Sequence, residues 1–177
     1  GDVYKRQVLI FVCERQTMVK AFFEALYPGY TITADWTTTN VMTLNFVNDE
    51  IVNGPFGDIR GLLWGNDSYG ASGAQGLPDD DQIVVISRNS SGTPMILRHK
   101  RYNLLFISEG GFAANHNGAT GSGAGGSAST YPLAIDTSFK PMTRTGWTGG
   151  NVENARLMAN ALAWAIKQAQ YNGINTP

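Results

Sequence analysis

The apolar positions near the start of the chain follow first a strand pattern and then a helix pattern. Val8 to Val12 form a continuous β-branched and aromatic run, which is typical of a strand buried on both faces. The next apolar positions recur at helical spacing: Met18, Val19, Phe22, Phe23 and Leu26. Pro28-Gly29 stops that pattern, and Tyr30 to Ala34 alternates like a second strand. A strand, a helix and a strand in this order predict an α/β unit.

Three short strands are predicted in the middle of the chain, at Ile83–Ser87, Pro94–Arg98 and Asn103–Ser108. The segments that join them are short enough for antiparallel hairpins. Further extended segments are expected within Val41–Val47 and Ile59–Trp64. Two long irregular stretches remain, from Gly65 to Asp81 and from Gly110 to Gly150, and loops of that length are usually functional or disordered.

The last helix is predicted over about Val152 to Gln170, with Asn151 as its cap. One face is expected to pack on a sheet, and Leu157 and Trp164 extend the apolar surface around it. The residues of this face are Met158, Ala161, Leu162, Ala165, Ile166 and Ala169. With 177 residues the chain fits one domain, which we place at 8–170, followed by a short tail at 171–177. Residues 1–7 resemble a translated sequencing adaptor, which predicts a domain truncated at its N-terminus; the alternative is an ordinary polar lead-in to a strand.

Composition excludes several classes of protein. Lys and Arg number 13 against 14 Asp and Glu, and this balance lacks the basic surface of a nucleic-acid binder. No apolar run approaches the roughly 18 residues of a membrane span. One cysteine cannot form an internal disulfide, and no Cys/His spacing predicts a metal site. Only 15% of residues are charged, whereas Asn (14), Thr (15) and Gly (21) are plentiful. This composition favours an extracellular or cell-surface protein.

The segment Ser108-Glu109-Gly110-Gly111 holds the best site candidate, because ligands of α/β sheets bind at the ends of central strands. Glu109 supplies a carboxylate, and the two glycines let a ligand approach the backbone. His116 follows closely and would be a general base beside Glu109 in an enzyme. The alternative is that Glu109 caps its own loop and that His116 is solvated. His99 stands in a basic hairpin turn and is expected at the surface.

The other candidate sites are less well supported by the residues around them. Cys13 follows a strand, but Val12 and Glu14 replace the small neighbours of a nucleophile elbow, so a buried thiol is the simpler interpretation. The run 79–81 and Asp67 offer calcium ligands without the closing Glu of a calcium loop. The glycine pattern at 121–126 lacks the strand and helix that a dinucleotide site needs. An aromatic sugar-stacking platform, or alternatively the edge of the core, is offered by Trp36, Trp64, Tyr69, Tyr131 and Trp147.

Three phrases carry a resemblance to a known superfamily. They are Asn53-Gly-Pro-Phe-Gly-Asp58, Leu104-Leu-Phe-Ile-Ser-Glu-Gly110 and the closing Asn154-x5-Asn160-Ala-Leu-Ala-Trp164-Ala165. In this order they resemble the class I glutamine-amidotransferase-like superfamily, especially its ThuA-like branch without amidotransferase activity. The resemblance implies a flavodoxin-like three-layer α/β/α sandwich over Val8 to Gln170, here with an antiparallel extension of the sheet. The G-x-C-x-G elbow and the His-Pro-Glu phrase of the amidotransferases are absent from this chain.

The sequence therefore predicts a non-catalytic binding or structural module of an exported bacterial protein, in the style of Bacteroidales surface proteins. Its ligand would be a glycan or a protein, with no metal and no cofactor. The predicted binding residues are Glu109, Gly110, Gly111, Asp58 and Asp67. Two alternatives stay open: a hydrolase of carbohydrate or a related substrate with Glu109 and His116 as acid and base, and an adhesion or fimbrial subunit whose sheet edge accepts a partner strand.

Overall fold

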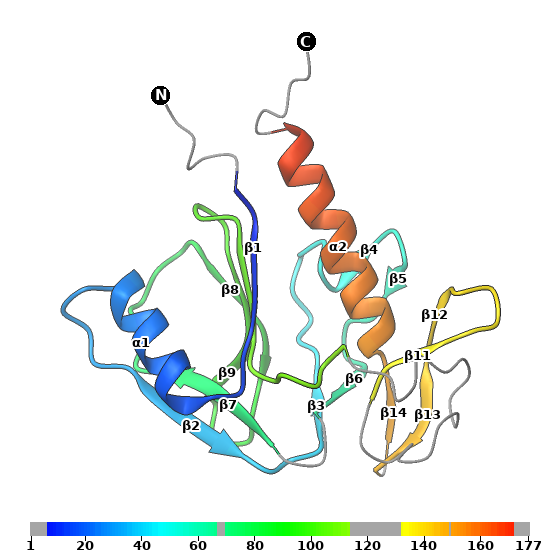
Figure 1. Cartoon of the computed structure of the whole chain (residues 1–177), viewed down its shortest axis with the longest axis horizontal. Coiled ribbons are helices and arrows are strands. Elements are labelled where there is room, and N and C mark those ends of the chain that lie inside the picture. The colour runs from blue at the N-terminus through cyan, green and yellow to red at the C-terminus, as the bar shows by residue number, and fades with distance from the viewer. Residues whose placement is uncertain (1–6, 67–69, 114–131, 149, 172–177) are drawn as a thin grey trace.

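The computed structural model describes residues 7–66, 70–113, 132–148 and 150–171 (Figure 1). The fold is mixed α/β: in this described part, two helices pack with several small sheets. Neither of these helices is long and apolar enough to cross a bilayer.

The first sheet has the order β1 (Leu9–Val12), β10 (Leu104–Ile107), β9 (Pro94–His99), β8 (Ile83–Arg88). β1 and β10 are parallel, whereas β10, β9 and β8 are joined by hairpins and run antiparallel. The backbone nitrogen of Cys13 donates to the carbonyl of Ile107 at 3.0 Å, which extends the parallel pairing one residue past the end of β1. The carboxyl ends of β1 and β10 therefore meet at one edge of the sheet.

Successive residues of β10 enter two different cores, because side chains alternate across a strand. Phe106 packs with Val19 and Phe23 of α1 (Gln16–Leu26). Leu105 and Ile107 enter the larger core, to which α2 (Asn154–Tyr171) contributes these residues: Leu157, Ala161 and Trp164. The helical stripe in the sequence forms because Val19 and Phe23, four residues apart, face the same core.

A two-stranded sheet, β2 (Thr33–Thr37) with β7 (Ala71–Gln75), lies beside α1. A second four-stranded sheet has the order β13 (Arg144–Trp147), β14 (Gly150–Val152), β6 (Leu63–Gly65), β3 (Val41–Thr43). The remaining strands form two short hairpins, β4 (Asn53–Gly54) with β5 (Gly57–Asp58), and β11 (Ala134–Ile135) with β12 (Pro141–Met142).

Ser87 joins the two four-stranded sheets. Its hydroxyl accepts a hydrogen bond from the indole nitrogen of Trp64 at 2.8 Å and donates to the carbonyl of Thr43 at 2.8 Å. Leu44 and Ser87 also form a β-bridge between the sheets. Trp64 is fully buried, so this bond satisfies a polar atom that the core would otherwise leave unpaired.

Two asparagines attach α2 to the rest of the fold. The Asn154 side chain accepts from the Gly65 nitrogen at 2.8 Å and donates to the carbonyls of Gly65 and Phe112 at 2.7 and 3.0 Å. Asn160 accepts from the Phe56 nitrogen at 2.9 Å and donates to the carbonyls of Ile51 and Gly57. Both asparagines are fully buried, so their amides replace backbone pairing where loops meet the helix.

The structure confirms the helix after the first strand, the three middle strands and the last helix. The expected cap was wrong: Asn151 lies within β14, and α2 begins at Asn154. The expected packing face was partly wrong, since Leu162 and Ile166 are 50% and 59% exposed, whereas Leu157 and Trp164, expected beside that face, are buried. The supposed loop after Gly65 contains a strand, β7, and the supposed irregular stretch after Gly110 contains three described strands, β11, β12 and β13.

Candidate binding site

The carboxyl edge of the parallel pair β1 and β10 brings two loops together. Glu14 follows β1, Gly110 follows β10, and the Gly110 nitrogen donates to Oε2 of Glu14 at 3.2 Å. A Cβ atom at position 110 would lie 3.0 Å from that oxygen, so a glycine lets the two loops approach. This edge is where open α/β sheets place their ligands.

A cavity of about 290 Å3 opens beside Glu14. Its lining is Glu14, Arg15, Gln16, Thr17 and Trp36. Arg15 is the extended residue before α1, and Gln16 opens the helix. The Gln16 side chain donates to the Ala34 carbonyl at 3.0 Å, which holds the start of α1 against β2.

Trp36 reaches the cavity from β2 and is 43% exposed. Its neighbour Asp35 points to the other face of the strand, where its carboxylate accepts from Asn89 at 2.8 Å and Thr93 at 2.7 Å. These bonds fix β2 and therefore the direction of Trp36. A Cβ atom on Gly70, whose φ is +128°, would lie 2.6 Å from the indole, so that glycine leaves room for the ring.

The cavity combines an open aromatic face with groups that form hydrogen bonds. Glu14 offers a carboxylate and Arg15 a guanidinium, while Gln16 and Thr17 add an amide and a hydroxyl. An exposed indole beside such groups stacks well on a flat, partly apolar ligand whose rim carries hydroxyls. Carbohydrate rings have this character.

No protein-family model and no curated protein matches the chain. Of the predicted binding residues, Gly110 lies at the edge described above and bonds to Glu14, which lines the cavity.

Glu109 is fully buried, and its Oε1 accepts from the Gly111 nitrogen at 2.6 Å. Its carboxylate therefore holds the backbone of its own loop, which was the alternative that the sequence left open. His116 lies outside the described residues, so its pairing with Glu109 as an acid and base stays a prediction.

Asp58 is placed on β5, in the hairpin whose other strand, β4, packs against α2 (Figure 1). Arg60 donates to its carboxylate from Nε at 2.8 Å and from Nη2 at 2.6 Å, and these bonds lower the pKa of Asp58 to about 2. Asp58 does not line the cavity beside Glu14. Asp67, the other outlying candidate, falls outside the described residues.

The remaining candidates are distributed over the core and the surface. Cys13 is buried among the apolar residues that α1 covers. Trp64 and Trp147 are buried, which agrees with the alternative that the sequence left open, that these rings belong to the core rather than to an exposed sugar platform. Tyr69 and Tyr131 lie outside the described residues. Within the described ranges, no group of three or more His, Cys, Asp or Glu side chains gathers to hold a metal ion.

His99 was expected at the surface, and this was wrong: its side chain is buried. The ring stacks on Tyr102 with centroids 4.3 Å apart, and Nδ1 accepts from the Tyr102 nitrogen at 3.3 Å. Nε2 faces Oδ2 of Asp80 at 3.4 Å. Burial lowers the pKa of His99 below its ordinary value of 6.5, against the opposing effect of Asp80.

The sequence interpretation missed Glu14, Arg15, Gln16 and Thr17. Their signal was their position, directly between the apolar strand β1 and the helix that follows it, where the edge rule for α/β sheets applies. The expectation that this strand is buried on both faces was wrong, since Leu9 is 46% exposed and the rest of β1 is partly buried. The nearness of Trp36 carried no such signal, because it depends on how β2 and β7 pack beside α1.

Proposed function

We propose that this protein is a non-catalytic glycan-binding module of an exported bacterial protein. The observation that carries the proposal is the exposed indole of Trp36 in one cavity with Glu14, Arg15 and Gln16. The indole stacks on the apolar face of a sugar ring, and the three polar side chains accept or donate hydrogen bonds at its hydroxyls.

Binding without catalysis is supported by how the reactive groups are used. The thiol of Cys13 is buried in the core, and Glu109 is buried with its carboxylate on the Gly111 nitrogen. Glu14 accepts from Gly110 and is the one carboxylate among the described residues that line this cavity. A glycosidase of the usual kind needs two carboxyl groups that flank the scissile bond.

For the fold, we propose an amidotransferase-like, flavodoxin-like three-layer sandwich with an antiparallel extension. Support comes from the parallel pair β1 and β10 and from the two cores, one with α1 and one with α2, on the two sides of that sheet. The absent elbow and His-Pro-Glu phrase agree with a member that has no amidotransferase chemistry. An extracellular or cell-surface location is supported by the polarity that Asn, Thr and Gly supply.

The test is a titration of the protein with neutral and acidic oligosaccharides, followed by calorimetry. We expect at least one of them to bind, and Trp36→Ala to weaken that binding about tenfold or more, as loss of a central aromatic anchor does. Phe46→Ala is the matched control, because Phe46 is an exposed aromatic residue that does not line this cavity. Equal binding by Trp36→Ala, or no binding of any oligosaccharide, would overturn the proposal.

A further inference from the structure

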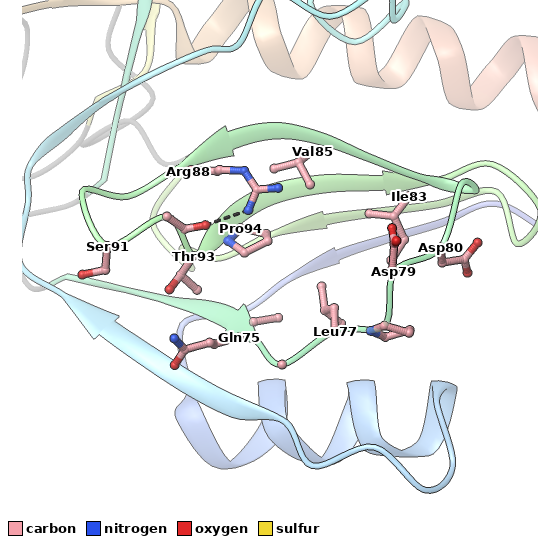
Figure 2. Close-up of a pocket in the computed structure, with 14 residues that line it drawn as sticks. Gln75, Leu77, Asp79, Asp80, Ile83, Val85, Arg88, Ser91, Thr93 and Pro94 are labelled. Carbon is pink, nitrogen blue, oxygen red and sulfur yellow. Dashed lines mark hydrogen bonds between the residues drawn. The ribbon is translucent and has the colours of Figure 1, made fainter.

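A second cavity, of about 330 Å3, lies over β8 and is larger than the one beside Trp36 (Figure 2). One wall is residues 74–80, at the end of β7 and beyond it. The other is formed by β8 and by residues 91–94 of the β8–β9 hairpin. We call this cavity the β7–β8 groove.

The groove exists because α1 covers only part of its side of the sheet. Leu97 and Phe106, on the two central strands, are fully covered in the core that α1 builds. Ile83 and Val85 of the edge strand β8 stay half-exposed and form an apolar floor. Leu77 and Pro94 add to that floor, and none of the described lining residues is aromatic.

The two ends of the groove carry opposite charges (Figure 2). At one end Arg88 donates to the Gly92 carbonyl at 2.6 Å, which steadies the guanidinium over the groove. At the other end lie Asp79 and Asp80. In the described part of the chain, neither Arg88 nor Asp79 forms an ion pair, so both charges are available to a ligand.

Asp80 is held in place by three neighbours. Oδ1 accepts from the Gln82 nitrogen at 2.9 Å, and Oδ2 faces the Tyr27 hydroxyl and His99 Nε2, each at 3.4 Å. The bond from Gln82 lowers the pKa of Asp80, so this end of the groove is anionic at neutral pH. The negative end is therefore fixed by the fold rather than by a freely rotating side chain.

The separation of the two charged ends sets the length of a ligand. Ile83, whose nitrogen donates to the Asp80 carbonyl at 3.0 Å, lies five residues before Arg88 on β8. Five strand residues span at most about 17 Å, and the irregular register between Val85 and Arg88 shortens this distance. An extended peptide of five residues spans about 14 Å from its first to its fifth Cα atom, and long charged side chains at its two ends cover the remainder. In such a peptide the first, third and fifth side chains share a face.

We propose that the β7–β8 groove binds an extended peptide segment of a partner protein, with a cationic side chain at Asp79 and Asp80 and a carboxylate four residues away at Arg88. The middle side chain of the five is apolar and rests on Ile83 and Val85. Gln75 lines the groove and offers its amide to the peptide backbone. This site is separate from the glycan cavity, which lies at the other end of α1: Tyr27 at the C-terminal end contacts Asp80, and Gln16 at the N-terminal end lines the glycan cavity.

The test uses peptides with blocked ends and measures binding by calorimetry at low salt. Lys-Thr-Val-Thr-Glu and its reverse, Glu-Thr-Val-Thr-Lys, cover both chain directions. We expect at least one to bind, and the like-charged Lys-Thr-Val-Thr-Lys and Glu-Thr-Val-Thr-Glu to bind about tenfold more weakly or worse. Failure of both mixed-charge peptides at millimolar concentration, or equal binding of all four, would overturn the proposal.

Charge reversal provides the second test. Arg88→Glu should move the preference to the Lys–Lys peptide, whereas Asp79→Lys, with the anionic Asp80 still beside it, should weaken binding of the mixed-charge peptides. Both positions are exposed, so far-ultraviolet circular dichroism should be unchanged. Lys140→Gln removes an exposed charge elsewhere and should change nothing. Trp36→Ala should also bind the peptide normally, which separates the peptide proposal from the glycan proposal. An unchanged peptide preference in Arg88→Glu would contradict the peptide proposal.

Discussion

The backbone nitrogen of Gly110 donates to Oε2 of Glu14 at 3.2 Å, which ties the loop after β10 to the loop after β1. These residues are 96 positions apart in the chain, and the parallel pairing of their strands brings them together. The bond aligns the carboxylate of Glu14 at the rim of the Trp36 cavity. A change at either residue should therefore alter the cavity before it alters the fold.

Gly110→Ala tests this relationship. The new Cβ would lie 3.0 Å from Oε2, closer than nearly all such contacts, and the flexible Glu14 side chain would have to move. We expect glycan binding to weaken about threefold to tenfold, while the free energy of unfolding falls by less than about 1 kcal/mol. Calorimetry and urea unfolding measure the two effects. Unfolding of the variant under native conditions would instead show that the contact supports the whole fold.

Trp36 should be the tryptophan that reacts first with an oxidant. All four tryptophans lie in the described residues, and Trp64, Trp147 and Trp164 are 1% exposed or less against 43% for Trp36. Limiting N-bromosuccinimide should therefore modify Trp36 selectively, and mass spectrometry of peptides should locate the product. Prior addition of a bound oligosaccharide should slow the reaction. Equal reaction at a second tryptophan would contradict the described burial.

The fold was most predictable where the apolar pattern was dense. The helical stripe, with Val19 and Phe23 buried, and the continuous apolar run at Leu104 to Ile107 both form the expected elements. Met18, at the start of the stripe, is 54% exposed. β7, Ala71–Gln75, gave no such signal because it consists of small and polar residues. Packing explains why a small residue stands at position 73, because a Cβ atom on Gly73 would lie 2.5 Å from the sulfur of Met95.

The site was less predictable than the fold. Trp36, Trp64 and Trp147 have the same chemistry in the sequence, and only tertiary packing buries two of them and leaves the first exposed. Glu109 had the expected position after β10, but its short bond to Gly111 turns the carboxylate into the loop. Local sequence shows which residues stand at a strand end, whereas the direction of each side chain depends on partners far away in the chain.

Asn154→Ala should destabilise the protein strongly. The asparagine makes three hydrogen bonds to the backbone of Gly65 and Phe112, and its removal leaves buried groups unpaired. We expect a loss of about 3 kcal/mol in the free energy of unfolding, measured in urea. Asn151→Ala is the matched control: Asn151 is exposed and accepts one bond from Gly146, so its loss should cost about 0.5 kcal/mol. Equal losses would refute the role given to Asn154.

His99 should make the stability depend on pH just below neutrality. Burial lowers the pKa of His99 in the folded state, so below about pH 6.5 the unfolded chain binds more protons than the folded one. Its contribution is fully present above the unfolded pKa and is lost as the pH falls toward the folded pKa. The free energy of unfolding should therefore decrease on acidification, by at most about 1.4 kcal/mol per pH unit for one proton.

The charged and titratable groups around the ring are Asp80, Tyr27, Tyr102 and Arg101. The neighbouring carboxylate, Asp80, has a lowered pKa and therefore titrates at a lower pH than this window. His99→Asn keeps an acceptor near the Tyr102 nitrogen but has no titrating ring, so its stability should vary less between pH 7 and pH 5.5. Urea unfolding at several pH values, with both proteins side by side, measures this difference. The same pH slope in both would show that other groups control the acid sensitivity.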